Sequence, residues 1–218
     1  QANTTAGFSI VLYTGTGSEG TVAHGLSSAP EVLFIKNRTD ARSWVFGHVS
    51  GGFTGQYTLN TNGAFSTNAG SFNDTAPTST VVNVNTDQTT NESGDSMVMY
   101  CWHSVDGYSK FGKYVGNSST DGTFVYTGFR PALVMVKLSS GSGEDWIVWD
   151  NKRDVDNVTH NKLYWNASGA EITDTTNRMI DMVSNGFKHR ADHVSTNTGG
   201  TYIYMAFAEM PFKYSNAR

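Results

Sequence analysis

The stretch that decides the fold, "DGTFVYTGFRPALVMVK" at 121–137, restates an earlier one, "EGTVAHGLSSAPEVLFIK" at 19–36. Each runs through Gly-Thr, a short apolar pair, a Gly, a Pro, an apolar run and a Lys. The match continues outward: "GFSIVLYTG" (7–15) pairs with "GYSKFGKYVG" (107–116), and "SWVFGH" (43–48) with "DWIVWD" (145–150). Landmarks in fixed order at nearly constant spacing indicate that the chain contains one unit twice.

The duplication sets the predicted domain boundaries. We expect one copy at 7–106 and a second at 107–213, with a lead-in at 1–6 and a tail at 214–218. The chain begins with Gln rather than Met, which favours a piece of a longer protein. No Gly/Ser-rich or Pro-rich linker separates the copies, so they are predicted to pack as one rigid unit.

The composition favours an all-β fold. Charged residues make up only 16% of the chain, aromatic residues 12%, and Gly alone accounts for 23 of the 218 residues. Short runs rich in β-branched and aromatic residues alternate with turn signals such as "NTNG" and "SSGSGED". Each copy is therefore predicted to be an antiparallel β-sandwich, jelly-roll-like, and "DTTNRMIDMV" (174–183) is the best candidate for a short helical turn.

Charge and cysteine content exclude several classes of function. A net charge of −4 leaves no basic stripe for nucleic acid. The single cysteine, Cys101, excludes an internal disulfide and cysteine-based zinc sites. No stretch reaches the length of apolar residues that a membrane span needs, so membrane insertion is not expected.

Residues that correspond across the copies are interpreted as scaffold. Trp44 matches Trp146, and Trp102 matches Phe207, so all four are predicted to anchor the cores. His24 is aligned with Tyr126, an exchange that a packing ring tolerates and a general base does not.

Residues without a counterpart are the better candidates for recognition. Trp149 is aligned with Gly47, and Trp165 with Thr61. Trp149, Tyr164, Trp165 and Asn166 are therefore a candidate platform for stacking a sugar ring. The alternative is that these aromatics cover a neighbouring copy or subunit.

Two candidate metal sites and one enzymatic reading stay open. Asp150, Asp154 and Asp156 offer oxygen ligands for calcium, although a salt-bridged turn fits the intervening Lys152 and Arg153 as well. The spacing of His189 and His193 suits two ligands on one helical face, or two solvated loop histidines. A glycosidase would need two carboxylates that face each other, and no such pair stands out, so the chain is predicted not to be an enzyme and to need no cofactor beyond the calcium.

The motifs resemble a known family. "YCWHSVDGYSKFGKYVGN" (100–117), "FVYTGFRPALVMVK" (124–137) and "YIYMAFAEMPF" (202–212) resemble repeats in bacteriophage structural proteins, tail-fibre and other virion-surface proteins especially of marine phages. The resemblance covers about 7–213 and departs from the usual pattern at "CWHS" (101–104). It implies a β-sandwich module within a larger appendage, often trimeric, on the virion surface.

Three functions follow as expectations. The first is a non-enzymatic structural or adhesion domain of a tail fibre, tail or capsid-surface protein, which associates with itself as a trimer, with other virion proteins and with a host glycan. The second is a lectin-like carbohydrate-binding module. The third is a glycan-cleaving enzyme, which would depend on Asp154 and Asp156.

Overall fold

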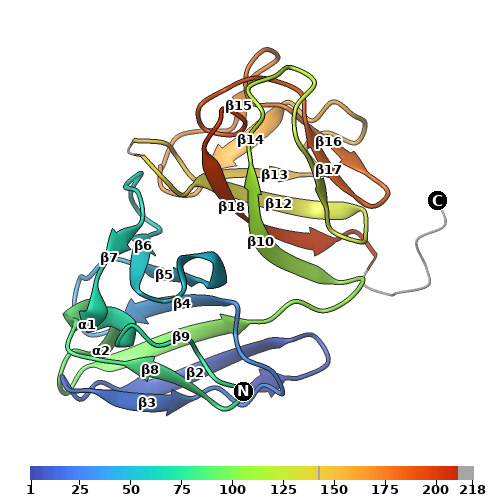
Figure 1. Cartoon of the computed structure of the whole chain (residues 1–218). Helices are drawn as coiled ribbons and strands as arrows, with labels where there is room; N and C mark the ends of the chain where they lie inside the picture. The colour runs from blue at the N-terminus through green and yellow to red at the C-terminus, as the bar shows by residue number, and fades with distance from the viewer. Residues whose placement is uncertain (142, 211–218) are drawn as a thin grey trace. The chain divides into compact units, whose positions relative to one another are not determined.

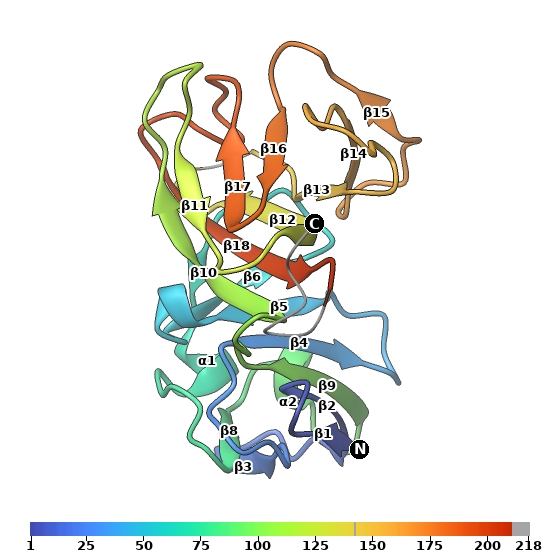
Figure 2. The same cartoon turned by 90° about the vertical axis from the view of Figure 1, so that its right-hand side faces the viewer.

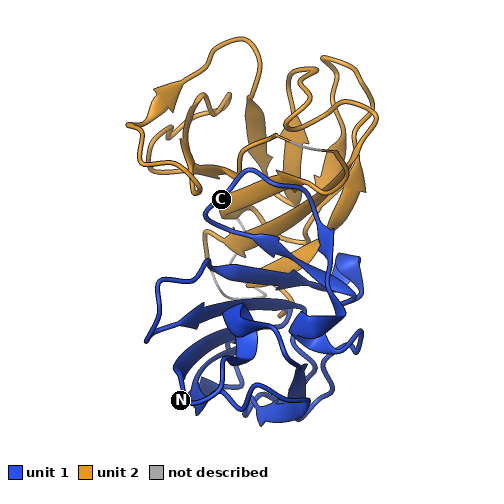
Figure 3. Cartoon of the chain, turned by 90° about the vertical axis from the view of Figure 1, so that its left-hand side faces the viewer, with its two compact units in different colours: residues 1–104 blue, residues 105–218 orange. Residues whose placement is uncertain are grey.

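The chain forms two compact units, residues 1–104 and 105–218 (Figure 3). They are seen in a computed structural model, which describes residues 1–141 and 143–210. The unit boundary lies two residues before the one expected from the repeat. The predicted tail at 214–218 and the end of the second copy at 211–213 lie outside the described residues. The rigid packing of the two copies stays a prediction.

Unit 1 is built from one large and one small antiparallel sheet (Figure 1). The large sheet has the order β1 (Ala2–Asn3), β2 (Phe8–Thr14), β9 (Ser96–Trp102), β4 (Val32–Asn37), β5 (Val45–His48), β6 (Gly55–Thr58) and β7 (Ser66–Thr67). The small sheet pairs β3 (Gly20–Ala23) with β8 (Val81–Val84). Three single turns of helix connect the strands: η1 (Val49–Gly51), α1 (Ala69–Phe72) and α2 (Gln88–Asn91).

Unit 2 repeats this topology with two differences: its large sheet has no counterpart of β1, and its small sheet has one strand more. Its large sheet has the order β10 (Ser109–Val115), β18 (Thr201–Ala208), β12 (Pro131–Leu138), β13 (Ile147–Asp150), β14 (Asn161–Tyr164) and β15 (Ile172–Thr173). Its small sheet has the order β11 (Phe124–Tyr126), β17 (Gly186–His189) and β16 (Ile180–Val183). The predicted all-β, sandwich-type fold is confirmed, but the helical turn expected within 174–183 is wrong, because 180–183 is strand β16.

Each core lies between the large and the small sheet of its own unit. In unit 1, Leu33 and Met99 of the large sheet pack with Val82 of the small sheet. In unit 2, Val134 and Tyr202 pack with Phe187 in the same way. The predicted central strand at 32–35 is confirmed, since β4 pairs with β9 on one side and β5 on the other.

In each unit a tyrosine strand, β2 with Tyr13 or β10 with Tyr114, is tied by the same hydrogen bonds to a turn that carries a buried asparagine. In unit 1 the Tyr13 hydroxyl donates to the carbonyl of Thr90, and the side chain of Asn91 donates to two loop carbonyls. In unit 2 the Tyr114 hydroxyl donates to the carbonyl of Thr196 over 2.7 Å, and Asn197 makes the matching bonds. A buried amide with all its partners fixes the surrounding loops.

A glycine follows each of these tyrosine strands, and the reason is the same in both units. A Cβ added at Gly15 would lie 2.0 Å from the carbonyl oxygen of Glu92, and one at Gly116 would lie 1.9 Å from that of Thr198. Backbone passes so close at both places that only glycine fits. This motif, hidden in "TDQTTNES" (86–93) and "DHVSTNTG" (192–199), is a part of the repeat that the sequence comparison did not identify.

Candidate functional site

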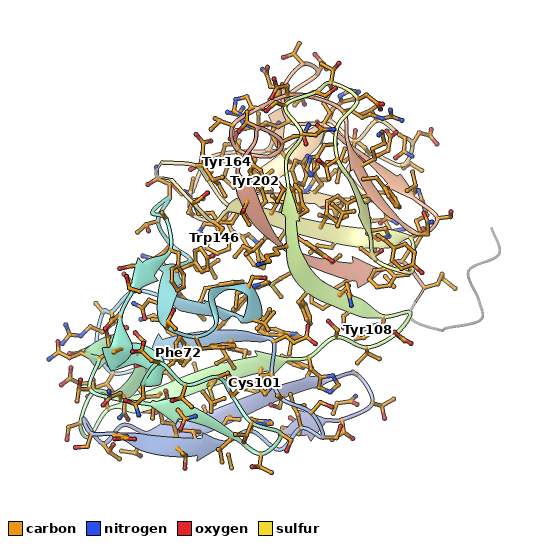
Figure 4. All side chains as sticks on the ribbon, viewed as in Figure 1. Phe72, Cys101, Tyr108, Trp146, Tyr164 and Tyr202 are labelled. Carbon is orange, nitrogen blue, oxygen red and sulfur yellow. The ribbon has the colours of Figure 1, made fainter. Side chains whose placement is uncertain are left out.

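The predicted sugar platform does not form as one surface. Trp149 is fully buried in the core of unit 2, and its indole N–H donates to the carbonyl of Arg178 over 3.1 Å. Tyr164 is half-buried against the same core (Figure 4), whereas Trp165 is 42% exposed. The side chain of Asn166 is bonded to the Trp146 N–H and to Asp145. Trp149 is therefore not a recognition residue.

Trp149 lacks a counterpart because unit 1 fills the same space differently. Gly47 pairs with Leu33 as Trp149 pairs with Val134 in the equivalent strand. A Cβ at Gly47 would lie 3.0 Å from the rings of Phe53 and Phe72. The repeat places Thr159 and Arg178 where unit 1 has those two rings. One large ring in unit 2 thus replaces two smaller rings in unit 1, as a close-packed core requires.

Trp146 is fully buried, as predicted, but none of the four residues predicted to anchor the cores belongs to the cluster between the two sheets of its unit. Side chains alternate across a strand, so the inward position of Cys101 turns Trp102 outward, and that of Ala206 turns Phe207 outward. Trp44 is partly buried, and Trp146, although buried, precedes the inward-facing Ile147. The clusters between the sheets are built from residues on the other face of each large sheet.

The three aspartates of the predicted calcium site are committed to the protein itself. Asp150 accepts hydrogen bonds from two backbone N–H groups and pairs with Arg153 at 2.7 Å. Asp154 accepts the N–H groups of His160 and Asn161. Throughout residues 1–141 and 143–210, no three His, Cys, Asp or Glu side chains gather closely enough to hold a metal ion. Asp150 and Arg153 therefore form the salt-bridged turn, the alternative to a calcium site. Among the described residues, Asp156 belongs to no group of three potential metal ligands.

The two histidines spaced four apart have unrelated roles. His189 is buried among Tyr114, Trp149 and Phe187, with ring centroids at 5.0 Å, 6.4 Å and 5.7 Å. His193 lies in a loop, where its Nδ1 accepts the N–H of Ser195 over 3.1 Å. They lie in a strand and a loop rather than on one helical face, so the expected ligand spacing is not realised.

A network of charged and polar side chains, here called the ion cluster, is the main chemical feature of unit 2. It consists of Glu144, Lys162, Asp174, Arg178, His193 and Ser195. Asp174 lies at its centre, with one carboxylate oxygen 3.3 Å from Lys162 Nζ and 3.2 Å from an Arg178 guanidinium nitrogen. The other oxygen accepts the N–H groups of Thr176 and Asn177. Lys162 is fully buried, so its ammonium needs the opposite charge of Asp174 to offset the loss of hydration.

Ser195 extends the ion cluster to Glu144. Arg178 Nε donates to Ser195 Oγ over 3.3 Å, and Ser195 Oγ in turn donates to the Glu144 carboxylate. His193 accepts the backbone N–H of Ser195, not its hydroxyl. The arrangement of Ser195, His193 and Glu144 is thus a loop cap joined to an ion pair, and it lacks the serine-to-histidine hydrogen bond of a hydrolytic triad.

The pKa shifts in the ion cluster follow from burial and pairing. Burial would raise the pKa of Asp174, but the two backbone N–H groups and the Lys162 ammonium together hold that pKa well below its ordinary value. Burial lowers the pKa of Lys162, and the neighbouring Asp174 opposes this shift. For His193, burial also lowers the pKa, with Arg178 acting in the same direction. Asp174 therefore stays ionised and is unsuited to donate a proton at neutral pH.

Unit 1 has uncharged or oppositely charged residues at the matching positions. Gln56 stands at the position of Lys162, since both are paired to the adjacent short strand in the same register. Asn68 stands at the position of Asp174, and both cap the turn that follows them. Asp87 stands at the position of His193, since both accept hydrogen bonds from the turn of the repeated asparagine. The ion cluster is therefore a feature of unit 2 that the scaffold does not demand.

Comparison with known families places the whole repeat pair in one group. A family described as "Domain of unknown function (DUF7483)" matches residues 1–211. The chain belongs to the DUF7483 family. No curated protein and no solved structure matched it. The described part of this DUF7483 chain contains no helix with the length and apolarity needed to cross a bilayer.

The pairing of Lys162 with Asp174 gives a first testable prediction. We expect Asp174→Asn to lower the free energy of unfolding more than Lys162→Gln does, because it leaves a buried ammonium beside Arg178. The double variant installs the Gln and Asn of unit 1. Its loss of free energy of unfolding should be smaller than the sum of the two single losses, by a coupling energy of about 2 kcal/mol. Urea denaturation at neutral pH measures all four proteins, and strictly additive losses would contradict the pairing.

Proposed function

We propose that the chain is a non-enzymatic structural and adhesion module of a bacteriophage virion appendage, in a tail fibre, a tail or a capsid-surface protein. The resemblance of its repeats to virion-surface proteins supports this, as does the duplicated all-β scaffold. Such a module contributes to assembly and attaches to the host surface, outside the cell. A lectin-like carbohydrate-binding module is the alternative, favoured by exposed aromatic rings in unit 2.

The observation that carries the proposal is how the two units differ. The order of the shared strands, their antiparallel pairing and the buried asparagine are the same in both units, while several charged and aromatic residues of unit 2 stand where unit 1 has other residue types. The two units keep one scaffold but carry chemically different side chains on it. This pattern is typical of binding proteins, in which function lies in the site rather than in the fold.

The paired state of the ion cluster supports a non-enzymatic role. A glycan-cleaving enzyme needs a carboxylic acid whose pKa is raised, so that it can donate a proton to the leaving group. The pKa of Asp174 is shifted the opposite way, and Asp154 is occupied by backbone N–H groups of its own loop. These carboxylates hold loops in place.

The test is binding without cleavage. We expect the purified chain to sediment with bacterial cells in a saturable manner, and to release no reducing sugar ends from capsular polysaccharide or lipopolysaccharide. Sedimentation followed by immunoblotting measures the first, and a reducing-end assay the second. Release of reducing ends that Asp154→Asn or Asp156→Asn abolishes would replace the proposal with the enzymatic one.

Self-association is a further expected outcome. Fibre modules gain avidity by presenting several copies of one site, so the chain is expected to form a trimer. Multi-angle light scattering across a dilution series measures the mass directly. A strictly monomeric mass at the highest concentration would count against trimer formation by these two units.

A further inference from the structure

The small sheet of unit 2 presents two exposed aromatic rings on its outer face. Figure 2 shows β11, β17 and β16 side by side in this sheet. Phe124 and Tyr126 are two residues apart on β11, so they share one face, and they are 44% and 65% exposed. Val125 between them points into the core. Two large rings at this level of exposure on one strand indicate an interaction surface.

Glycines let both rings lie against the backbone. Gly186 is the cross-strand partner of Tyr126, and a Cβ added there would lie 3.0 Å from the Phe124 ring. A Cβ at Gly128 would lie 3.6 Å from the Tyr126 hydroxyl oxygen. Each ring therefore lies close to a glycine and keeps a large part of its surface exposed to solvent. We name Phe124, Tyr126, Gly128 and Gly186 the ring platform.

A balanced pair of charges borders the ring platform. Lys188 is the direct cross-strand partner of Phe124 and lies on the same face. Its Nζ is 2.9 Å from an Asp121 carboxylate oxygen and also donates to the carbonyl of Gly122. The hydrogen bond from Lys188 lowers the pKa of Asp121, whose side chain is 83% exposed, so the carboxylate stays ionised. An ionised carboxylate and an ammonium together accept from and donate to hydroxyl groups.

The first unit lacks the ring platform at the same place in its fold. Counting from the repeated Gly25 and Gly128, Thr21 corresponds to Phe124 and Ala23 to Tyr126. Asn83 corresponds to Lys188, because it pairs with Thr21 as Lys188 pairs with Phe124. The scaffold therefore tolerates small residues here, and the rings of unit 2 are not required for folding.

We propose that the ring platform, with Asp121 and Lys188, binds a neutral carbohydrate, whose C–H face stacks on Tyr126 and Phe124 while its hydroxyl groups bond to the charged pair. Flat rings beside a polar rim suit a pyranose, which has one apolar face and polar edges. Each nearby cation already has a carboxylate partner, Lys188 with Asp121 and Arg190 with Asp181, so the surface has no net charge to attract an anionic ligand.

The proposal rests on the adhesive function above, and its test separates the two. The intact chain is applied to an array of neutral and anionic oligosaccharides from bacterial surfaces, together with the double variant Phe124→Thr/Tyr126→Ala, which installs the residues of unit 1. Trp165→Ala, which removes an exposed ring elsewhere in unit 2, is the matched control. Circular dichroism and the melting temperature verify that each variant is folded.

We expect the wild type to bind neutral oligosaccharides, the double variant to bind them about tenfold or more weakly, and the control to bind as the wild type does. Asp121→Asn should also weaken binding. Three outcomes would each overturn the proposal: unchanged binding of neutral oligosaccharides by the double variant, binding of anionic glycans only, or binding of an unglycosylated protein and of no glycan on the array. If the wild type still sediments with cells in those cases, adhesion stands and the carbohydrate site falls; if it binds neither, both fail.

Discussion

Replacing Trp149 with alanine should lower the free energy of unfolding by about 3–5 kcal/mol, the cost of removing a fully buried large aromatic ring. The ring is 0% exposed, belongs to the core cluster of unit 2 and donates its N–H to a backbone carbonyl. The neighbouring positions carry Thr159 and Arg178 where unit 1 has Phe53 and Phe72, so unit 2 lacks the two rings that fill this space in unit 1. Thermal and urea denaturation followed by circular dichroism measure the loss.

The control is the other tryptophan that lacks a counterpart. Trp165 is 42% exposed, and Trp165→Ala should change stability by less than about 1 kcal/mol. If Trp149→Ala were as stable as wild type, the proposed exchange of one ring in unit 2 for two rings in unit 1 would be wrong.

Acid should destabilise unit 2 through His189, and His189→Val should remove most of this effect. Neither ring nitrogen of His189 has a hydrogen-bond partner, and burial lowers its pKa to about 3. In the unfolded chain the pKa is about 6.5, so the unfolded state binds the proton first. Stability is therefore complete above about pH 6.5 and falls as the pH drops toward the folded value, by about 4–5 kcal/mol in total.

The matched experiment uses the equivalent site of unit 1. Val84 occupies the position of His189, since the two small sheets share their register, and it is 2% exposed. Val84→His should introduce a loss of stability between pH 6.5 and 4 in unit 1, while His189→Val flattens the same range in unit 2. Urea denaturation as a function of pH gives both slopes. Equal pH slopes in wild type and His189→Val would show that another group controls the acid response.

The repeat could be predicted from the sequence because its strands and glycines are constrained by backbone geometry. Gly15 and Gly116 meet a carbonyl oxygen, and Gly25 and Gly128 have positive φ angles of 72° and 87°. These requirements do not depend on which side chains fill the core. The fold class followed from such landmarks.

The side-chain roles were harder to predict, for two physical reasons. A one-residue difference before Gly25 and Gly128 shifts the alignment, so the structural counterpart of His24 is Thr127, not Tyr126: each accepts the N–H two residues later. The second reason is that volume is exchanged between positions. In unit 1, Gly47 with Phe53 and Phe72 fills the space that Trp149 fills in unit 2, so an alignment gives this core tryptophan no aromatic counterpart. Tyr126 was consequently interpreted as scaffold, although it is 65% exposed.

The central claim is that unit 2 is the adhesive half of a duplicated scaffold. The most direct measurement is the sedimentation of the intact chain with bacterial cells, compared with that of Phe124→Thr/Tyr126→Ala. The variant should keep the melting temperature of the wild type and lose most of its cell binding. Cell binding equal to that of the wild type, with the fold intact, would contradict the claim.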